Sequence, residues 1–175
     1  MREAVFVCGP EASGTRMLTE AFVRAGYKGD YSHRQRLDHG DLTDAPEKIV
    51  FRRSCPHGGQ FPNLYEIVHR LQKADYVVRP VIIFRDKDVT VKSQVIARHV
   101  ENETKSRENI ERALFELFTN FVEIDLIPVV IYYKSFVSSV NSPEQMKFFN
   151  ADSKYAKQLR PTKLPDKPEK KIMFL

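Results

Sequence analysis

Residues 9–16, GPEASGTR, have the residue types and spacing of a loop that binds a phosphate group. An apolar run precedes this loop, and apolar residues return at helical spacing after it, so the segment predicts a strand, a loop and a helix. Backbone N–H groups of such a loop turn inward, and a helix beginning at Thr15 directs the positive end of its dipole to the same point. The residues expected at this anion site are the eight of the loop: Gly9, Pro10, Glu11, Ala12, Ser13, Gly14, Thr15 and Arg16.

The loop departs from the GxxxxGK[ST] pattern of P-loop nucleoside triphosphatases at the two positions whose side chains contact the phosphates and the metal ion. Thr15 stands where that pattern has the lysine that contacts the β- and γ-phosphates, and Arg16 stands where it has the hydroxyl that binds Mg²⁺. The phosphate cradle is therefore present without the usual metal site. This combination argues against ordinary hydrolysis of ATP or GTP.

A second segment with phosphate-binding side chains is PVIIFRDKDVTVKSQ, residues 80–94. It predicts a buried strand over 81–84 that ends at Arg85, followed by a helix over 89–97 that carries Ser93. Arginine offers a planar, charge-assisted fork for a phosphate, and the serine adds a hydroxyl from the helix behind it. We expect both side chains to bind the same anionic ligand as the loop.

Together the two segments resemble the sulfotransferases that use 3′-phosphoadenosine 5′-phosphosulfate (PAPS). In that family an SGT or GGTR segment after a strand binds the 5′-phosphosulfate, which matches residues 13–16 here. An arginine at a strand end and a serine eight residues later hold the 3′-phosphate, which matches Arg85 and Ser93. The loop is most similar to the Golgi carbohydrate branch and to short bacterial and viral members. The resemblance covers about a fifth of the chain.

The resemblance implies a three-layer α/β/α fold of the P-loop type with a mostly parallel sheet. It implies an enzyme that moves a sulfuryl group from PAPS, its co-substrate, to a hydroxyl on a small or carbohydrate acceptor, in line and without a metal. One departure concerns the leaving phosphate, because many members have a lysine where this chain has Ala12. The missing charge must then come from Arg16, which we expect to be catalytic, or from Arg52 or Arg53.

Sulfuryl transfer also needs a base to take the proton of the acceptor hydroxyl. His57, in SCPHGG, follows a strand end, and its place resembles that of the histidine base of the cytosolic branch. A histidine that simply occupies the Gly58–Gly59 bend is an equally good interpretation. Because the carbohydrate branch uses glutamate, Glu11, Asp38 and Asp41 remain open as alternatives.

Two other functions fit parts of the sequence. In a small nucleotide or metabolite kinase with a degenerate loop, Asp86 would serve as a metal ligand at the end of its strand. A PAPS-binding or nucleotide-binding module that has lost catalysis would explain Ala12 and the unassigned base. Metal-free binding of a bisphosphate, compared with binding of ATP and Mg²⁺, separates the kinase from the other two.

Composition limits the partners and the cellular setting of the chain. The net charge of +5 suits an anionic ligand, but 28 Lys and Arg residues are scattered among 23 acidic ones, without the basic stripe of a nucleic-acid-binding protein. No apolar run is long enough to span a bilayer. Two cysteines, Cys8 and Cys55, give no disulfide framework, so we expect free thiols and a cytoplasmic protein.

The elements that must position these residues alternate between strand and helix, which is typical of a parallel sheet covered on both faces. We expect one domain over residues 1–150 and a basic, proline-containing tail over 151–175. The expected strands span 4–8, 49–51, 81–84 and 129–133, and the expected helices span 15–25, 64–74, 89–97, 107–124 and 143–149, with 26–47 unassigned. Ligands of such folds bind where the strands end, which here points to residues 9–16, 53–59 and 85–88 and to Lys134.

Overall fold

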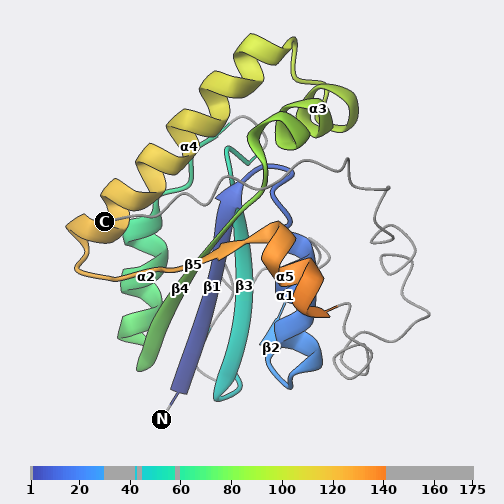
Figure 1. The fold of residues 1–175 in the computed structure, drawn as a ribbon. Helices are drawn as coiled ribbons and strands as arrows, with labels where there is room; N and C mark the ends of the chain where they lie inside the picture. Colours follow the sequence, from blue (N-terminus) through green and yellow to red (C-terminus); the bar gives the residue numbers. More distant parts are fainter. Residues whose placement is uncertain (1, 30–41, 43–44, 58–59, 141–175) are drawn as a thin grey trace, which may run out of the picture.

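The computed structural model describes residues 2–29, 42, 45–57 and 60–140, and a five-stranded, all-parallel sheet forms its centre (Figure 1). The strand order is β2-β3-β1-β4-β5. The strands are β1 (Arg2–Pro10), β2 (Lys28–Gly29), β3 (Lys48–Cys55), β4 (Tyr76–Phe84) and β5 (Val129–Tyr132). The central strand β1 is buried from Ala4 to its end, as a nearly continuous apolar run in a parallel sheet should be.

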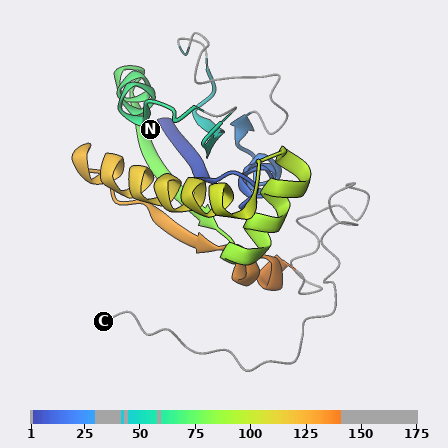
Figure 2. The same ribbon diagram turned by 90° about the horizontal axis from the view of Figure 1, so that it is seen from above.

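Helices cover both faces of the sheet, which gives three layers. They are α1 (Thr15–Arg24), α2 (Leu64–Lys73), α3 (Lys87–Arg98), α4 (Glu103–Glu123) and α5 (Tyr133–Val140). Figure 2 shows α2 and α4 on one side of the strands and α1 and α5 on the other. The larger core lies under α2 and α4, where Phe6 stacks on Phe51 with ring centroids 4.7 Å apart and meets Phe121 edge-on at 6.2 Å.

The helix α3 lies beyond the carboxyl ends of the strands (Figure 1) and is tied there by one buried side chain. Gln94 donates from Nε2 to the carbonyl oxygen of Glu11 at 2.8 Å, and its Oε1 accepts from Ser106 Oγ of α4, also at 2.8 Å. Both ends of the buried amide are therefore used. This bridge sets the position of α3 relative to the loop after β1 and to α4.

Most of the expected elements are confirmed, with differences at their ends. The strand expected over 81–84 begins five residues earlier, at Tyr76, because β4 runs through Pro80 beside the middle of β1. The short β2 was not expected. The expected strand over 129–133 ends at Tyr132, and a helix starts at the next residue. The helix expected over 143–149, the tail over 151–175, and Asp38 and Asp41 lie outside the described residues.

Two further expectations concern the side chains and the surface. Cys8 and Cys55 are free thiols, as the sequence predicts, and both are buried in the core under α2 and α4. Burial raises the pKa of the Cys55 thiol to about 12 and holds that of Cys8 well above its ordinary range. Among the helices that the structure describes, none combines the length and the apolar character needed to cross a membrane.

Gly9 lies at a close approach between β1 and β4, so its replacement tests the packing of the sheet. A Cβ on Gly9 would come within 2.1 Å of the carbonyl oxygen of Ile83, which is backbone and cannot rotate away. We expect Gly9→Ala to lower the free energy of unfolding by at least about 3 kcal/mol, measured by denaturant titration.

Gly26→Ala is the matched control, because Gly26 also has a positive φ, of 98°, but a Cβ there meets nothing within 4 Å. We expect that variant to lose only about 1 kcal/mol, from backbone strain alone. Equal losses in the two variants would contradict the close approach at Gly9.

Candidate functional site

The loop between β1 and α1 turns the chain sharply from the strand into the helix. Ala12 and Gly14 have positive φ values of 67° and 108°, which turn the chain from the end of the strand into the helix. The N–H of Glu11 donates to Cys55 O at 3.2 Å, and that of Ser13 donates to Pro10 O at 3.0 Å. The N–H groups of the first turn of α1 have no partner within the helix, and they lie at the positive end of its dipole.

Three buried residues with hydroxyl groups belong to this loop or lie beside it. Thr15 Oγ1, which stands where the P-loop pattern has lysine, lies 3.2 Å from Ser54 Oγ of β3. Ser13 is fully buried, and its Oγ makes no hydrogen bond with any residue that the structure describes. A buried hydroxyl without a partner costs free energy, which makes Ser13 Oγ the donor in the loop that gains most from a ligand.

Tyr133, the first residue of α5, joins the two segments that the sequence singles out. Its ring lies over Gly14, because a Cβ on Gly14 would come within 2.5 Å of Tyr133 Cδ2 and 2.7 Å of Cε2. The guanidinium carbon of Arg85 lies 4.7 Å from the centroid of the same ring, in cation–π contact. The loop and Arg85 therefore both contact the same aromatic ring.

The sequence pattern points to Lys134 at this strand end and not to Tyr133, but Lys134 is exposed in α5. The signal that marks Tyr133 is its place directly after β5, at the same sheet edge as the loop. Gln94, which anchors the loop to α3, was also missed. The sequence pattern points instead to its neighbour Ser93. In the structure Ser93 is half-buried on α3, with no described contact to Arg85 or the loop.

The three arginines proposed to replace the missing lysine lie in different places. Arg16 is half-buried in the first turn of α1. Side chains alternate along β3, and Ser54 contacts α1 while Cys55 enters the core under α2 and α4. By this alternation Arg52 is on the α1 face, and the buried Arg53 is on the opposite face. Arg16 and Arg52 therefore share a face of the sheet with the loop helix.

His57 and Asp86 are both held in local structure. The backbone of His57 pairs with that of Gln60 in two hydrogen bonds, of 2.7 and 3.1 Å. Asp86 is the N-cap of α3, where its carboxylate accepts from the N–H of Val89 at 3.1 Å. Helix capping is a structural role that accounts for an aspartate at this position.

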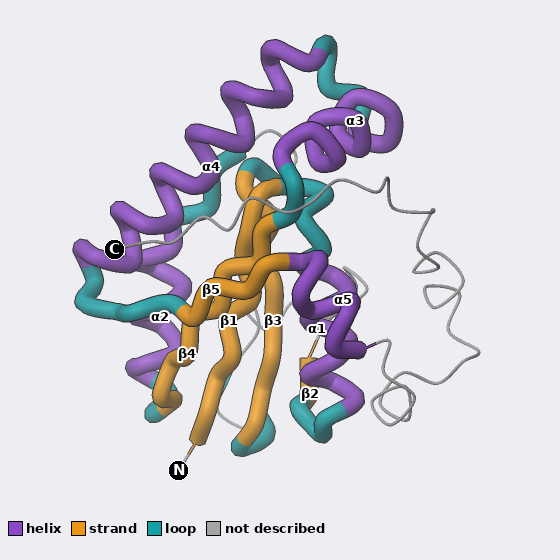
Figure 3. Tube along the Cα trace, viewed as in Figure 1, coloured by secondary structure: helices purple, strands orange, loops and turns teal. Residues whose placement is uncertain are grey.

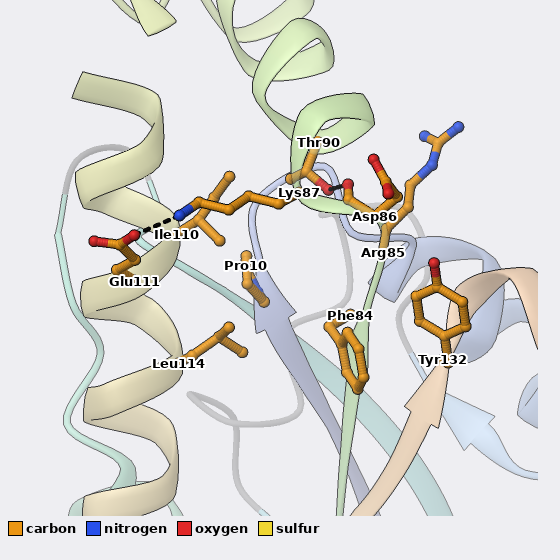
Figure 4. Close-up of a pocket in the computed structure, with 10 residues that line it drawn as sticks. All are labelled: Pro10, Phe84, Arg85, Asp86, Lys87, Thr90, Ile110, Glu111, Leu114 and Tyr132. Carbon is orange, nitrogen blue, oxygen red and sulfur yellow. Dashed lines mark hydrogen bonds and ion pairs between the residues drawn. The ribbon is translucent and has the colours of Figure 1, made fainter. Parts of the chain in front are cut away.

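A pocket of about 320 Å³ opens between the ends of β1, β4 and β5 and the helix α4 (Figure 4). Its walls are mostly apolar, and Lys87 reaches across it to the carboxylate of Glu111. The guanidinium of Arg85 points away from that ion pair in the same view. The described residues that line the pocket are Pro10, Phe84, Arg85, Asp86, Lys87, Thr90, Ile110, Glu111, Leu114 and Tyr132.

A second pocket, of about 450 Å³, lies between the loops after β1 and β3 and the carboxyl end of α3. Its described lining carries several polar side chains, among them those of Glu11, Arg98, His99 and Asn109. A Glu11 carboxylate oxygen lies 3.7 Å from Arg98 Nε. Burial raises the pKa of Glu11, and the opposing effect of Arg98 is smaller. Burial likewise raises the pKa of Tyr133.

The raised pKa of Glu11 predicts a pH-dependent effect of its replacement on stability. The folded chain holds the carboxyl proton more tightly than the unfolded chain does, so stability is lost as pH rises from the unfolded pKa through the folded one. We therefore expect Glu11→Gln to melt at a higher temperature than the wild type at about pH 7. The gap should close towards about pH 4, where the wild-type carboxyl is protonated.

Glu101→Gln is the control for this measurement, because Glu101 is exposed in the turn between α3 and α4. Its melting temperature should follow that of the wild type at both pH values. A lower melting temperature of Glu11→Gln than of the wild type at about pH 7, with the gap closing as the pH is lowered, would show instead that the charged carboxylate stabilises the fold.

Comparison of the chain with protein-family models, with curated proteins and with solved structures gave no match.

Proposed function

We propose that this chain is a sulfotransferase that moves a sulfuryl group from PAPS to a hydroxyl of a small or carbohydrate acceptor. The observation that carries the proposal is the contact of both Arg85 and Gly14 of the loop with the ring of Tyr133. The donor has a phosphate at each end of its ribose, so it needs two anion sites a short distance apart. The family resemblance of both segments supports the same assignment.

In this proposal the start of α1 and the hydroxyl of Ser13 bind the 5′-phosphosulfate. Arg16, on the same turn, supplies the positive charge that stabilises the departing phosphate, with Arg52 on the same face of the sheet as a second source. Arg85 and Ser93 bind the 3′-phosphate. The transfer is in line, since the acceptor oxygen attacks sulfur as the bond to the 5′-phosphate oxygen breaks.

The test is calorimetric titration with 3′-phosphoadenosine 5′-phosphate in EDTA, compared with ATP and Mg²⁺. We expect tight metal-free binding of the bisphosphate and weak binding of ATP. A preference for Mg-ATP would overturn the proposal in favour of a divergent kinase. Tight binding of the bisphosphate without transfer to any acceptor would instead favour a donor-binding module without catalysis, for which Ala12 would be the reason.

The role of Arg85 predicts selectivity between two ligands. Arg85→Ala should weaken binding of the bisphosphate about tenfold to a hundredfold, because a hydrogen bond to a charged group contributes about 1.5–3 kcal/mol. Binding of AMP, which lacks the 3′-phosphate, should weaken far less. Equal losses for the two ligands would contradict the assignment. Arg79→Ala is the matched control, since Arg79 is on the same strand but pairs with Glu3.

The role of Tyr133 predicts a difference between two substitutions. Tyr133→Ala should weaken binding of the bisphosphate by about 0.5–2 kcal/mol, because Arg85 loses the ring that holds it in place. Tyr133→Phe keeps the ring and should bind like the wild type. If the phenylalanine variant binds as weakly as the alanine variant, the hydroxyl is the group that matters, and the cation–π contact is not.

A further inference from the structure

The surface formed by α4 and the strand β5 carries most of the exposed apolar side chains in the described part of the chain. Ten large hydrophobic residues there are at least 38% exposed, and six of them lie between positions 115 and 130. We call these six the α4–β5 patch: Phe115, Phe118, Val122, Ile127, Val129 and Val130. Single exposed apolar residues are normal on a monomer, but a cluster of this kind marks an interaction surface.

The helix and the strand present their parts of the patch to the same side. Phe118 and Val122 follow Leu114 at helical spacing, and Leu114 lines the pocket that also contains Tyr132 of β5. Side chains alternate along a strand, so Val130 is on the same face of β5 as Tyr132. Figure 1 shows the chain turning from the end of α4 into β5. The patch therefore spans both elements and the turn between them.

The strand β5 is also an edge of the sheet. It pairs with β4 on one side, and no described strand pairs with its other side. Its four residues, VVIY, carry no charge, its register with β4 has no bulge, and Pro128 lies before the strand and not within it. Charges, internal prolines and bulges are the usual means by which proteins prevent an edge strand from pairing further. Their absence from β5 favours the addition of another strand.

The charges at the two ends of β5 differ in sign. Glu123 and Asp125 are exposed before the strand, and Lys134 is exposed two residues after it. If a second copy of β5 lies antiparallel to the first, the acidic start of one strand is next to the basic end of the other. A parallel copy would place like charges together. The acidic residues also disfavour an anionic lipid surface, which attracts lysine and arginine. The edge is therefore complementary to an antiparallel copy of itself.

The patch is large enough for a stable dimer. Its six residues are 40–92% exposed, and they present on the order of 700 Å² on each chain, against roughly 800 Å² per partner in a standard interface. Pairing of the strands would add backbone and neighbouring polar groups to this area. Interfaces of standard size have dissociation constants in the micromolar range or below.

We propose that this chain forms a homodimer with two-fold symmetry, in which the β5 strands of two copies pair antiparallel. The pairing joins two five-stranded sheets into one continuous sheet. The outer N–H and C=O groups of β5 gain partners, and the apolar side chains of the two patches pack against each other across the axis. This inference does not rest on the proposed function.

The first experiment measures the mass of the full chain by sedimentation velocity at micromolar concentration. The wild type should have twice the monomer mass of 20.3 kDa. Val130→Lys should raise the dissociation constant at least tenfold, because the charge is desolvated in the interface, once from each copy. Ile96→Lys is the matched control, since Ile96 is 77% exposed on α3 and lies outside the patch. Circular dichroism should show wild-type secondary structure in both variants.

The second experiment tests the antiparallel arrangement by charge reversal. Asp125→Lys and Lys134→Asp should each raise the dissociation constant about tenfold, because each places like charges together at both ends of the paired strands. The double variant should recover most of the wild-type affinity. Asp125 has a positive φ of 54°, which strains a lysine equally in the single and the double variant, so strain cannot explain a recovery. Glu101→Lys, in the exposed turn before α4, is the control and should dimerise like the wild type.

Three outcomes would each overturn the proposal. The first is a wild-type chain that is monomeric at micromolar concentration, which would mean that something other than a second copy covers the patch. The second is a dimer that Val130→Lys leaves intact, which would place the interface on another surface. The third is a double charge reversal that dimerises no more tightly than the single reversals, which would exclude the antiparallel pairing. None of these measurements depends on whether the chain binds PAPS.

Discussion

The close approach of β1 and β4 at Gly9 is the constraint on which the arrangement at the sheet edge depends. With no side chain at Gly9, the carbonyl oxygen of Ile83 packs directly against β1. The two strands run side by side as far as Cys8 and Ile82, and each leads into one of the two segments for which the sequence predicts phosphate binding. The separation of these segments is therefore fixed by backbone packing and not by the side chains that would contact a ligand.

A second constraint is the buried amide of Gln94, which links three elements at once. It bonds the loop through Glu11 and bonds α4 through Ser106, so α3 cannot shift without breaking a buried hydrogen bond. Such a bond contributes only about 1 kcal/mol when intact, but a partner left unsatisfied costs more. This asymmetry favours a single position of α3, and with it a fixed shape for the pocket that Glu11 borders.

Local patterns in the sequence were sufficient to predict the layers, the central strands and the start of α1. Apolar runs and helical spacing mark these elements directly, and the loop after β1 carries its own glycine signal. The face on which Arg52 and Arg53 lie could have been derived from strand alternation, but only if β3 were known to continue through Cys55. The sequence pattern predicts a short strand over 49–51 that ends in the two arginines, and at the end of a strand the direction of a side chain is not defined.

The contacts that assemble the candidate site were not predictable in this way. Tyr133 contacts Gly14 although more than a hundred residues separate them in the chain. Local periodicity in a sequence cannot predict a contact between such distant residues. Gln94 reads as a polar residue on a helix, and its burial follows only from the packing of α3 on α4. The direction of the Ser93 side chain depends on how α3 is rotated about its own axis. The number of residues between Arg85 and Ser93 does not determine that rotation.

The direct passage from β5 into α5, without an intervening residue, has a consequence for selectivity (Figure 3). Tyr133 follows β5 directly and is also the first residue of α5, so both elements fix the position of its ring. A site bordered by a rigid side chain selects among ligands by their size and shape. Such a site gains little additional selectivity from a conformational change after the ligand has bound. Changes of ligand in related sequences should therefore appear as changes in the bulk of the residue at this position.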